Sequence, residues 1–193
     1  PNRLLRNDLS DSGLFVAISA VAGDVMVSGP TFGATSLDYD RDGDIDIFLS
    51  ERGKAPNPGT CRLLRNDGDL LFTEVSSQAG VDLPGNYRHC SMGDFDNDGW
   101  SDIGVGGTDI AVLFRNNGDG TFTDVAAAAG VVSPGPNFGL VLDDFDGDGW
   151  MDIYLPKLQG IPVGPSGVFR NDGDGTFSDV SISSGMTGQR DMG

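Results

Sequence analysis

Short stretches in which apolar and polar residues alternate recur along the chain, as expected of strands that are buried on one face. Three stretches of nearly the same sequence follow an Asn-Asp-Gly or Asn-Asn-Gly turn, at residues 71–75, 121–125 and 176–180. Because Asn and Gly readily adopt the left-handed backbone of a tight turn, each stretch is predicted to be the second strand of a hairpin. One helical turn that ends at a Gly is predicted after each hairpin, at residues 76–80, 126–130 and 181–185.

Two further strands precede each hairpin. The first is predicted at residues 32–37, 88–93 and 138–143, and the second at residues 45–49, 103–105 and 153–155. Each repeat therefore holds four strands, called A to D here, and the A–B connections begin at residues 38, 94 and 144. Four-stranded antiparallel units that recur about every forty to fifty residues are typical of β-propeller blades. We therefore predict an all-β fold that forms a segment of a β-propeller.

Three complete blades and two partial ones are predicted within this single segment. The complete blades lie at residues 31–80, 87–130 and 137–186. Residues 1–28 are expected to supply strands C and D of a preceding blade, and residues 188–193 the start of a next one. Since a propeller ring normally needs four to eight blades, we expect the chain to be part of a longer propeller or to complete a ring by assembly.

Each A–B connection is an acidic loop, with Asp at positions 1, 3, 5 and 9 and Gly at position 6. So many carboxylates would repel one another unless a hard cation drew their oxygens inward. We expect one Ca²⁺ per loop, about three in total, held by the four Asp side chains and the main-chain carbonyl of position 7. The predicted metal ligands are Asp38, Asp40, Asp42, Asp44 and Asp46 in the first loop, Asp94, Asp96, Asp98, Trp100 and Asp102 in the second, and Asp144, Asp146, Asp148, Trp150 and Asp152 in the third.

Two other kinds of calcium loop fit this acidic sequence less well. An EF-hand needs a carboxylate at position 12, where these loops have Leu49, Val105 and Leu155, and no amphipathic helices flank them. The nonapeptide calcium repeat has a much shorter period. Magnesium suits a cage of protein oxygens less well than calcium does. A solvated acidic hairpin without an ion remains as an alternative.

The overall charge narrows the choice of partners. The chain has 12 Lys and Arg against 29 Asp and Glu, a formal net charge of −17, which repels phosphate backbones and anionic lipid surfaces. We therefore expect no nucleic-acid partner, and no apolar run is long enough for membrane insertion. Cys61 and Cys90 are the two cysteines, and their pattern leaves both free buried thiols and a disulfide open.

The acidic loops resemble those of a known repeat family. Together with Phe32-Gly33-Ala34 and Phe138-Gly139-Leu140 ahead of two loops, they are similar to the FG-GAP/VCBS repeats of integrin α-subunit propellers and of bacterial extracellular proteins. The hairpin sequences look most like the cartilage acidic protein-like branch. The resemblance implies that the A–B loops bind calcium and that the full propeller has about seven blades. Arg88-His89 replaces Phe-Gly in the second repeat, so its inner strand is expected to differ.

The order of strands places the functional features on two faces. The acidic loops and the C–D turns share one face, and the B–C and D–A connections lie on the other. On the acidic face, Arg65, Arg115 and Arg170 are expected to pair with nearby carboxylates or to pack along the blade. Trp100 and Trp150 are expected to cover apolar edges near the ion loops. The opposite face carries the connections that differ between repeats, at residues 52–60 and 157–167, which are either plain linkers or the place where a ligand binds.

These observations favour a binding module over an enzyme. His89 is the only histidine, and no nucleophile motif accompanies it, so a structural role is expected. We predict a calcium-stabilised propeller that acts as an interaction or adhesion scaffold for a protein or glycan ligand. Its expected location is extracellular, at the cell surface or in the periplasm. A carbohydrate-binding propeller and the non-catalytic part of a secreted enzyme remain as alternatives.

Overall fold

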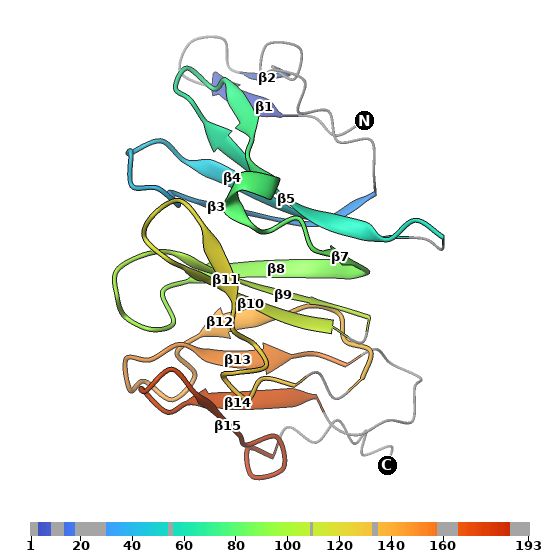
Figure 1. Cartoon of the computed structure of the whole chain (residues 1–193), viewed down its shortest axis with the longest axis vertical. Coiled ribbons are helices and arrows are strands. Elements are labelled where there is room, and N and C mark those ends of the chain that lie inside the picture. Colours follow the sequence, from blue (N-terminus) through green and yellow to red (C-terminus); the bar gives the residue numbers. More distant parts are fainter. Residues whose placement is uncertain are drawn as a thin grey trace.

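The computed structural model describes residues 4–8, 14–17, 30–53, 56–108, 110–132, 135–157 and 166–185. Within these ranges the chain forms antiparallel sheets and one four-residue helix (Figure 1). The predicted all-β class is therefore confirmed. That helix is too short to span a membrane, and the described part of the chain has no other candidate span.

Three sheets follow one another along the chain, each with its strands hydrogen-bonded in sequence order. The first comprises β3 (Thr31–Leu37), β4 (Asp46–Glu51), β5 (Gly59–Asn66) and β6 (Phe72–Glu74), with the short β7 (Pro84–Gly85) paired to β5. The second comprises β8 (Tyr87–Gly93), β9 (Asp102–Gly107), β10 (Ile110–Asn116) and β11 (Phe122–Asp124). The third comprises β12 (Val141–Asp143), β13 (Asp152–Leu155), β14 (Gly167–Asn171) and β15 (Phe177–Asp179). A separate pair, β1 (Leu5–Asp8) and β2 (Leu14–Ala17), precedes them.

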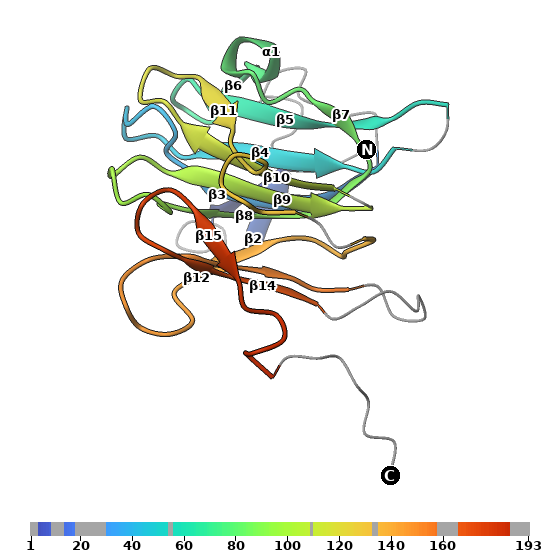
Figure 2. The same cartoon turned by 60° about the horizontal axis from the view of Figure 1, so that its bottom comes forward.

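The sheets stack face to face, as blades do in a propeller (Figures 1 and 2). Apolar side chains fill the space between the first and second sheets, where Phe48 of β4 meets Phe114 of β10 with ring centroids 6.2 Å apart. A second core, which includes Leu113 and Ile153, lies between the second and third sheets. Because successive residues of a strand point to opposite faces, Leu113 and Phe114 serve the two different cores. The chain is thus a β-propeller segment whose core lies between blades.

The strand registers place all the acidic loops along one edge of the stack. In the first sheet Leu37 pairs with Asp46 at the loop end, and Thr31 pairs with Glu51 at the other end. The hairpin after β5 begins at Asn66, whose N–H bonds the Asp46 side chain, so this hairpin lies beside the loop. Figure 1 shows this edge on the left and the B–C connections on the right.

One helical turn follows the first sheet, as predicted. It is α1 (Ser76–Ala79), which ends at Gly80 with a left-handed φ of 75°. The corresponding segments after β11 and β15 form turns that end at Gly130 and Gly185, with φ of 81° and 72°. The conformation recurs because a left-handed C-terminal residue satisfies the last carbonyls and glycine adopts it without strain.

Cys61 and Cys90 are free thiols, and both are buried in the core between the first and second sheets. The structure thus corresponds to the free-thiol alternative. The predicted start of a next blade, 188–193, lies outside the described residues. Of residues 1–28, only 4–8 and 14–17 are described.

Candidate metal centres in the acidic loops

The three acidic loops share one backbone conformation. The Gly at position 6 has φ of 92°, 90° and 91° in Gly43, Gly99 and Gly149, a region that other residues avoid. Position 4 is left-handed too, and Arg41 and Asn97 adopt it with φ of 60° and 56°. The sequence pattern already indicated that position 6 needs glycine. The structure adds that position 4 is left-handed as well.

Carboxylates at positions 1, 3 and 5 fold each loop inward by accepting hydrogen bonds from its own backbone. In the second loop Asp94 accepts from the N–H of Gly99 at 2.8 Å, and Asp98 accepts from the N–H of Trp100 at 2.8 Å. Asp96 accepts a longer bond, 3.3 Å, from the N–H of Asp98. The first and third loops repeat this pattern. Local bonds of this kind are characteristic of Asp in turns, and they fix the carboxylates in place.

The Asp at position 9 joins the loop to the neighbouring hairpin. In the second blade, Asp102 accepts from the N–H of Phe95 at 3.0 Å and from the N–H of Asn116 at 2.7 Å. Asp46 and Asp152 make the equivalent bonds. All three side chains belong to buried residues. A carboxylate oxygen can accept more than one bond, so these oxygens retain capacity for a cation.

Burial raises the pKa of these position-9 carboxyls. It raises the pKa of Asp46 to about 6 and that of Asp102 to about 7, although the backbone N–H bonds oppose the shift. The pKa of Asp152 is raised for the same reason. Burial is also the first cause of the raised pKa of Asp40 and of Asp96, and the nearest loop carboxylates add to it. Taking charge away from water is costly, so a cation at this point would offset that cost.

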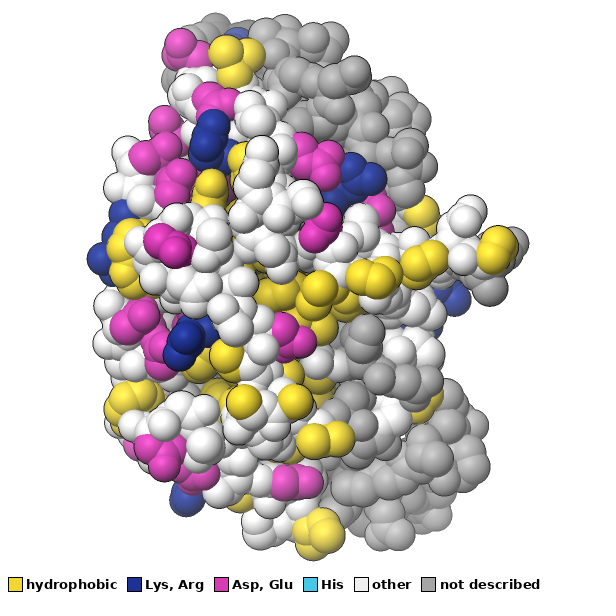
Figure 3. All heavy atoms as spheres, viewed as in Figure 1, with side chains coloured by type: hydrophobic (Ala, Val, Ile, Leu, Met, Phe, Trp, Pro, Cys, Tyr) yellow, Lys and Arg dark blue, Asp and Glu magenta, His cyan; other side chains and the backbone are white. Residues whose placement is uncertain are grey.

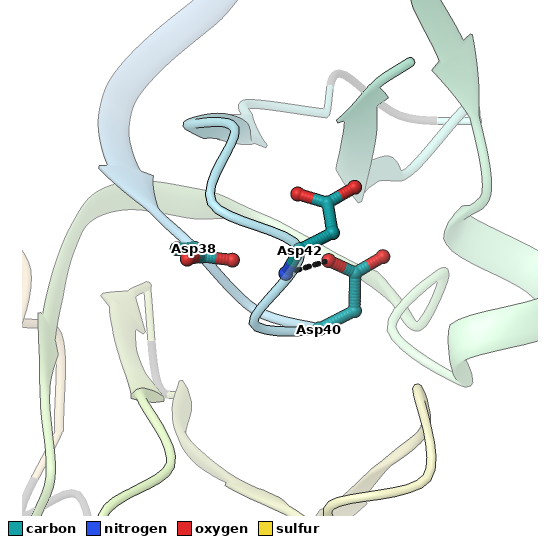
Figure 4. A group of neighbouring side chains, drawn as sticks. All are labelled: Asp38, Asp40 and Asp42. Carbon is teal, nitrogen blue, oxygen red and sulfur yellow. Dashed lines mark hydrogen bonds between the residues drawn. The ribbon is translucent and has the colours of Figure 1, made fainter. Parts of the chain in front are cut away.

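The carboxylates converge in each loop, with one oxygen from each of three Asp residues within 4.8 Å of the others. The groups are Asp38, Asp40 and Asp42 in the first loop, Asp94, Asp96 and Asp102 in the second, and Asp144, Asp146 and Asp152 in the third. Figure 4 shows the first group, with the Asp40 carboxylate beside Asp42 and bonded to its backbone nitrogen. One oxygen of Asp38 is buried and has no hydrogen-bond partner.

These donors fit a hard divalent cation. They are all oxygens, they come from one short loop, and an orphaned buried carboxylate oxygen is what a bound cation would satisfy. Three predicted side-chain ligands are not in these converging groups, but their carboxylates also accept bonds from the loop or its hairpin. Asp98 and Asp148 each accept from the N–H of position 7, and Asp46 accepts from the N–H groups of Tyr39 and Asn66. The predicted carbonyl ligands of Asp44, Trp100 and Trp150 stay a prediction.

The tryptophans at position 7 lie against the C–D turn of the same blade. A Cβ added to Gly118 would lie 2.9 Å from Nε1 of Trp100, and one added to Gly173 would lie 3.1 Å from Trp150. Arg41 of the first loop lies over the Trp100 ring, with its Cζ 4.1 Å from the ring centre. The tryptophans therefore lie against the hairpin turn of their own blade, and their covering of apolar edges stays a prediction.

Neighbouring loops are also joined to each other. Arg41 donates to the carbonyl of Gly99, and Asn97 donates to the carbonyl of Gly149 at 3.2 Å. In both pairs position 4 of one loop bonds position 6 of the next. The candidate metal centres therefore form a connected row along one edge, where acidic side chains recur in Figure 3.

An asparagine in each hairpin makes a connection that the sequence pattern did not reveal. Asn116 donates to the carbonyl of Ser101 in its own loop and to that of Tyr39 in the preceding one. Asn171 likewise donates to Met151 and to Phe95. In the sequence, turn chemistry alone accounts for an Asn at this place, so its second role stays hidden. The recurrence of Arg-Asn in every hairpin was the one sequence signal that could have indicated this connecting role.

The remaining residues singled out in the sequence have mostly structural contacts. Arg65 pairs with Asp67 at 2.7 Å and Arg170 with Asp172 at 3.2 Å, as expected. Arg115 is exposed, and it acts on Asp96 through its charge. Nδ1 of His89 lies 3.4 Å from the carbonyl oxygen of Leu140 in the next blade.

Comparison with known proteins gives two results. Residues 38–105 and 94–155 match a family model described as FG-GAP-like repeat. A solved structure of an Agrocybe aegerita lectin, described by its title as recognising non-reducing terminal N-acetylglucosamine, resembles the chain with a TM-score of 0.48 and 22% identity. That likeness covers 93% of this chain and 46% of the lectin, so the chain spans just under half of the lectin's length. No curated protein matches the chain.

Proposed function

Since this chain belongs to the FG-GAP-like repeat family, we propose that its acidic loops bind calcium and that the ions stabilise a propeller used as an interaction scaffold. The observation that carries the proposal is the convergence of three carboxylates in each of three loops. Similar backbone bonds hold these groups in place in all three loops, and the orphaned oxygen of Asp38 supports a cation in the first loop. Asp46, Asp102 and Asp152 would connect each ion to the next hairpin.

Calcium binding is tested by melting the protein in EDTA and in excess calcium, with titration calorimetry for the number of sites. Binding to the folded form alone adds about 2.7 kcal/mol per site at a hundredfold excess over the dissociation constant. We expect three sites and a melting temperature that falls in EDTA. Asp96→Asn should remove one site, whereas Asp82→Asn, an exposed residue outside the loops, should remove none. Equal melting curves with and without EDTA, and no heat of binding, would contradict the proposal.

An extracellular location is proposed together with calcium binding. Extracellular calcium modules bind with dissociation constants of roughly 10⁻⁴ to 10⁻³ M, and cytosolic buffers bind far more tightly. We expect the loops to belong to the weaker class, because their carboxylates are exposed except at position 9 and in part at positions 1 and 3. A measured constant near 10⁻⁸ M would place the protein with intracellular calcium binders instead.

The scaffold role, rather than catalysis, is proposed because the clustered carboxylates are committed to the loops. Each accepts backbone hydrogen bonds that a reacting acid or base would have to give up. Ligand binding is proposed for the opposite edge, where the B–C connections of the repeats differ. Arginines and exposed phenylalanines at that edge could contact a partner.

A pocket on the acidic edge supports a second candidate, carbohydrate binding. Its volume is about 640 Å³, and it lies between the first and second blades, lined in part by Tyr39, Asp40, Arg65, Trp100 and Thr121. Aromatic faces beside polar side chains suit the apolar and hydroxyl-bearing sides of a sugar. A glycan array with calcium-loaded protein tests this candidate. Glycan signals that are lost in Trp100→Ala and kept in Trp150→Ala would support carbohydrate binding. An array without signals would reject it.

A further inference from the structure

Two arginines at the edge opposite the acidic loops, Arg52 and Arg88, lack the carboxylate partners that Arg62, Arg65 and Arg170 have. Arg62 pairs with Glu51 and Glu74, and Arg65 and Arg170 pair with aspartates. Among the described residues no carboxylate pairs with Arg52 or Arg88, and Nε of Arg88 is buried without a hydrogen-bond acceptor. In a chain of net charge −17, two unpaired cations at one place are unexpected.

These two cations also lie close enough to affect each other. Burial and the charge of Arg52 both lower the pKa of Arg88. Arg52 directly follows β4, and Arg88 is the second residue of β8, so the two come from adjacent blades. Like charges held together cost free energy unless an anion lies between or beside them. The described residues supply no such anion.

Each guanidinium is held over an exposed phenylalanine ring. The Cζ of Arg52 lies 5.4 Å from the centre of the Phe32 ring, and that of Arg88 lies 5.1 Å from the centre of the Phe138 ring. The two phenylalanines are 51% and 49% exposed. Cation–π contacts restrict the arginine heads before a ligand arrives, which lowers the entropy cost of binding.

The residues stand in a row across three blades. Phe32, Arg88 and Phe138 occupy the same position in the three repeats, where the sequence reads Phe-Gly, Arg-His and Phe-Gly. A pocket of about 430 Å³ opens between them, lined also by His89, Leu140 and Pro156. The floor of this pocket is mostly apolar, and Arg88 in its lining comes from the blade whose sequence departs from the Phe-Gly pattern.

A ligand for this pocket must combine two properties. Carboxylates match the planar fork of a guanidinium, and apolar side chains match the phenylalanine rings and the pocket floor. The alternation of ring and cation across three neighbouring blades favours an extended chain over a small anion, which would leave the phenylalanine rings uncovered. A nucleic acid is disfavoured by the net charge of the protein.

We propose that this pocket binds an extended acidic segment of a partner protein, in which Asp or Glu alternates with aromatic or large aliphatic residues. Arg52 and Arg88 would receive the carboxylates, and Phe32 and Phe138 would contact the apolar side chains. The assignment rests on the proposed function in one respect, the placement of ligand binding at the edge opposite the calcium loops.

Fluorescence anisotropy on the full chain in calcium tests the proposal with defined probes. The first peptide is labelled acetyl-(Asp-Phe)₃-amide, and the controls replace Asp by Lys or Phe by Ser. The acidic apolar peptide should bind more tightly than both controls, and added salt should weaken it. This preference is informative because the net charge of −17 would by itself favour the Lys peptide.

Variants then locate the binding. Arg88→Gln and Arg52→Gln should each weaken the acidic peptide about tenfold, the size expected when a hydrogen bond between charged groups is lost. Arg115→Gln removes the same charge from an exposed position on the opposite edge and should leave binding unchanged. Equal loss in Arg115→Gln and Arg88→Gln, or tighter binding of the Lys peptide, would overturn the proposal.

Melting each variant with and without calcium separates the two proposals. Arg88→Gln should keep the calcium-dependent rise in melting temperature, because Arg88 lies at the far end of β8 from the acidic loop. If calcium raises the melting temperature of the wild-type protein but the protein binds no peptide, only the peptide assignment is overturned. Absence of the rise would instead contradict the proposed calcium function.

Discussion

The side-chain amide of Asn116 donates a 2.8 Å hydrogen bond to the main-chain carbonyl of Tyr39, 77 residues earlier. The same amide bonds Ser101 in its own blade, so one buried side chain holds the acidic loops of two successive blades. Asn171 repeats the arrangement with Phe95 and Met151. Asn66 bonds only Ile45 of its own loop through its amide nitrogen, within the described residues. The hairpin asparagine is therefore a connection between blades.

Replacing Asn116 by Ala should destabilise the protein by about 2 kcal/mol, because one buried and one partly buried carbonyl lose their donor. Urea unfolding measures this change in the free energy of unfolding. Asn117→Ala, at an exposed neighbouring position, should cost much less. Asn66→Ala should lie between them, since it loses one such bond. A loss of stability in Asn117→Ala as large as that in Asn116→Ala would contradict the role of Asn116 as a connection between blades.

Without calcium, the protein should become less stable as pH rises from about 4 to about 7. The folded pKa of Asp46 is about 6 and that of Asp102 about 7, both raised above the ordinary value of 3.8. The folded form therefore holds more protons in this window, and stability that is full below about pH 4 is lost as pH rises through the folded pKa values.

Calcium should reverse this trend, because the ion binds the deprotonated carboxylates. Thermal melts at pH 5 and pH 7.5, in EDTA and in calcium, measure both effects. Asp102→Asn should flatten the EDTA profile, and Asp67→Asn should not, since the pKa of Asp67 is lowered and this carboxyl titrates below the window. A melting temperature in EDTA that rises from pH 5 to pH 7.5 would contradict the raised pKa values of Asp46 and Asp102.

Gly149→Ala should destabilise the third loop through its backbone alone. Gly149 has φ of 91°, and an added Cβ would meet no atom within 4 Å, so the cost is conformational, about 1 to 2 kcal/mol. Gly147→Asn is the matched control, because Asn97 occupies the same loop position with φ of 56°. Chemical denaturation should show a clear loss for the first variant and almost none for the second.

Cys61 and Cys90 should resist alkylation in the folded protein. Both thiols are buried, with 0% and 2% exposure, and burial raises the pKa of Cys90 to about 11 and that of Cys61 as well. Iodoacetamide followed by mass spectrometry should add no label in calcium and two labels in urea. Faster labelling after EDTA is expected if calcium holds the blades together. A mass lower by two hydrogens would instead indicate a disulfide.

The repeat made the fold predictable from sequence, because turn residues and strand alternation act locally and recur three times. The same reasoning located the acidic loops and the edge on which they lie. Contacts between blades were not predictable in this way. The bond from Asn116 to Tyr39 and the contact of Arg52 with Phe32 depend on how the chain packs in three dimensions. In the sequence, Arg88 stood out only as a departure from Phe-Gly, and its missing acceptor became visible once its surroundings were known.

The direction of the asparagine bonds has a consequence for synthesis on the ribosome. Tyr39 and Phe95 receive their side-chain donors from Asn116 and Asn171, which are made 77 and 76 residues later. The first and second blades thus emerge before the donor of one main-chain carbonyl has been made, and the following blade supplies that donor. The blades should therefore reach their final structure in order from the amino end, each one only after the next has been synthesised. In a stalled nascent chain, the last acidic loop should lack the hydrogen bond from the following blade.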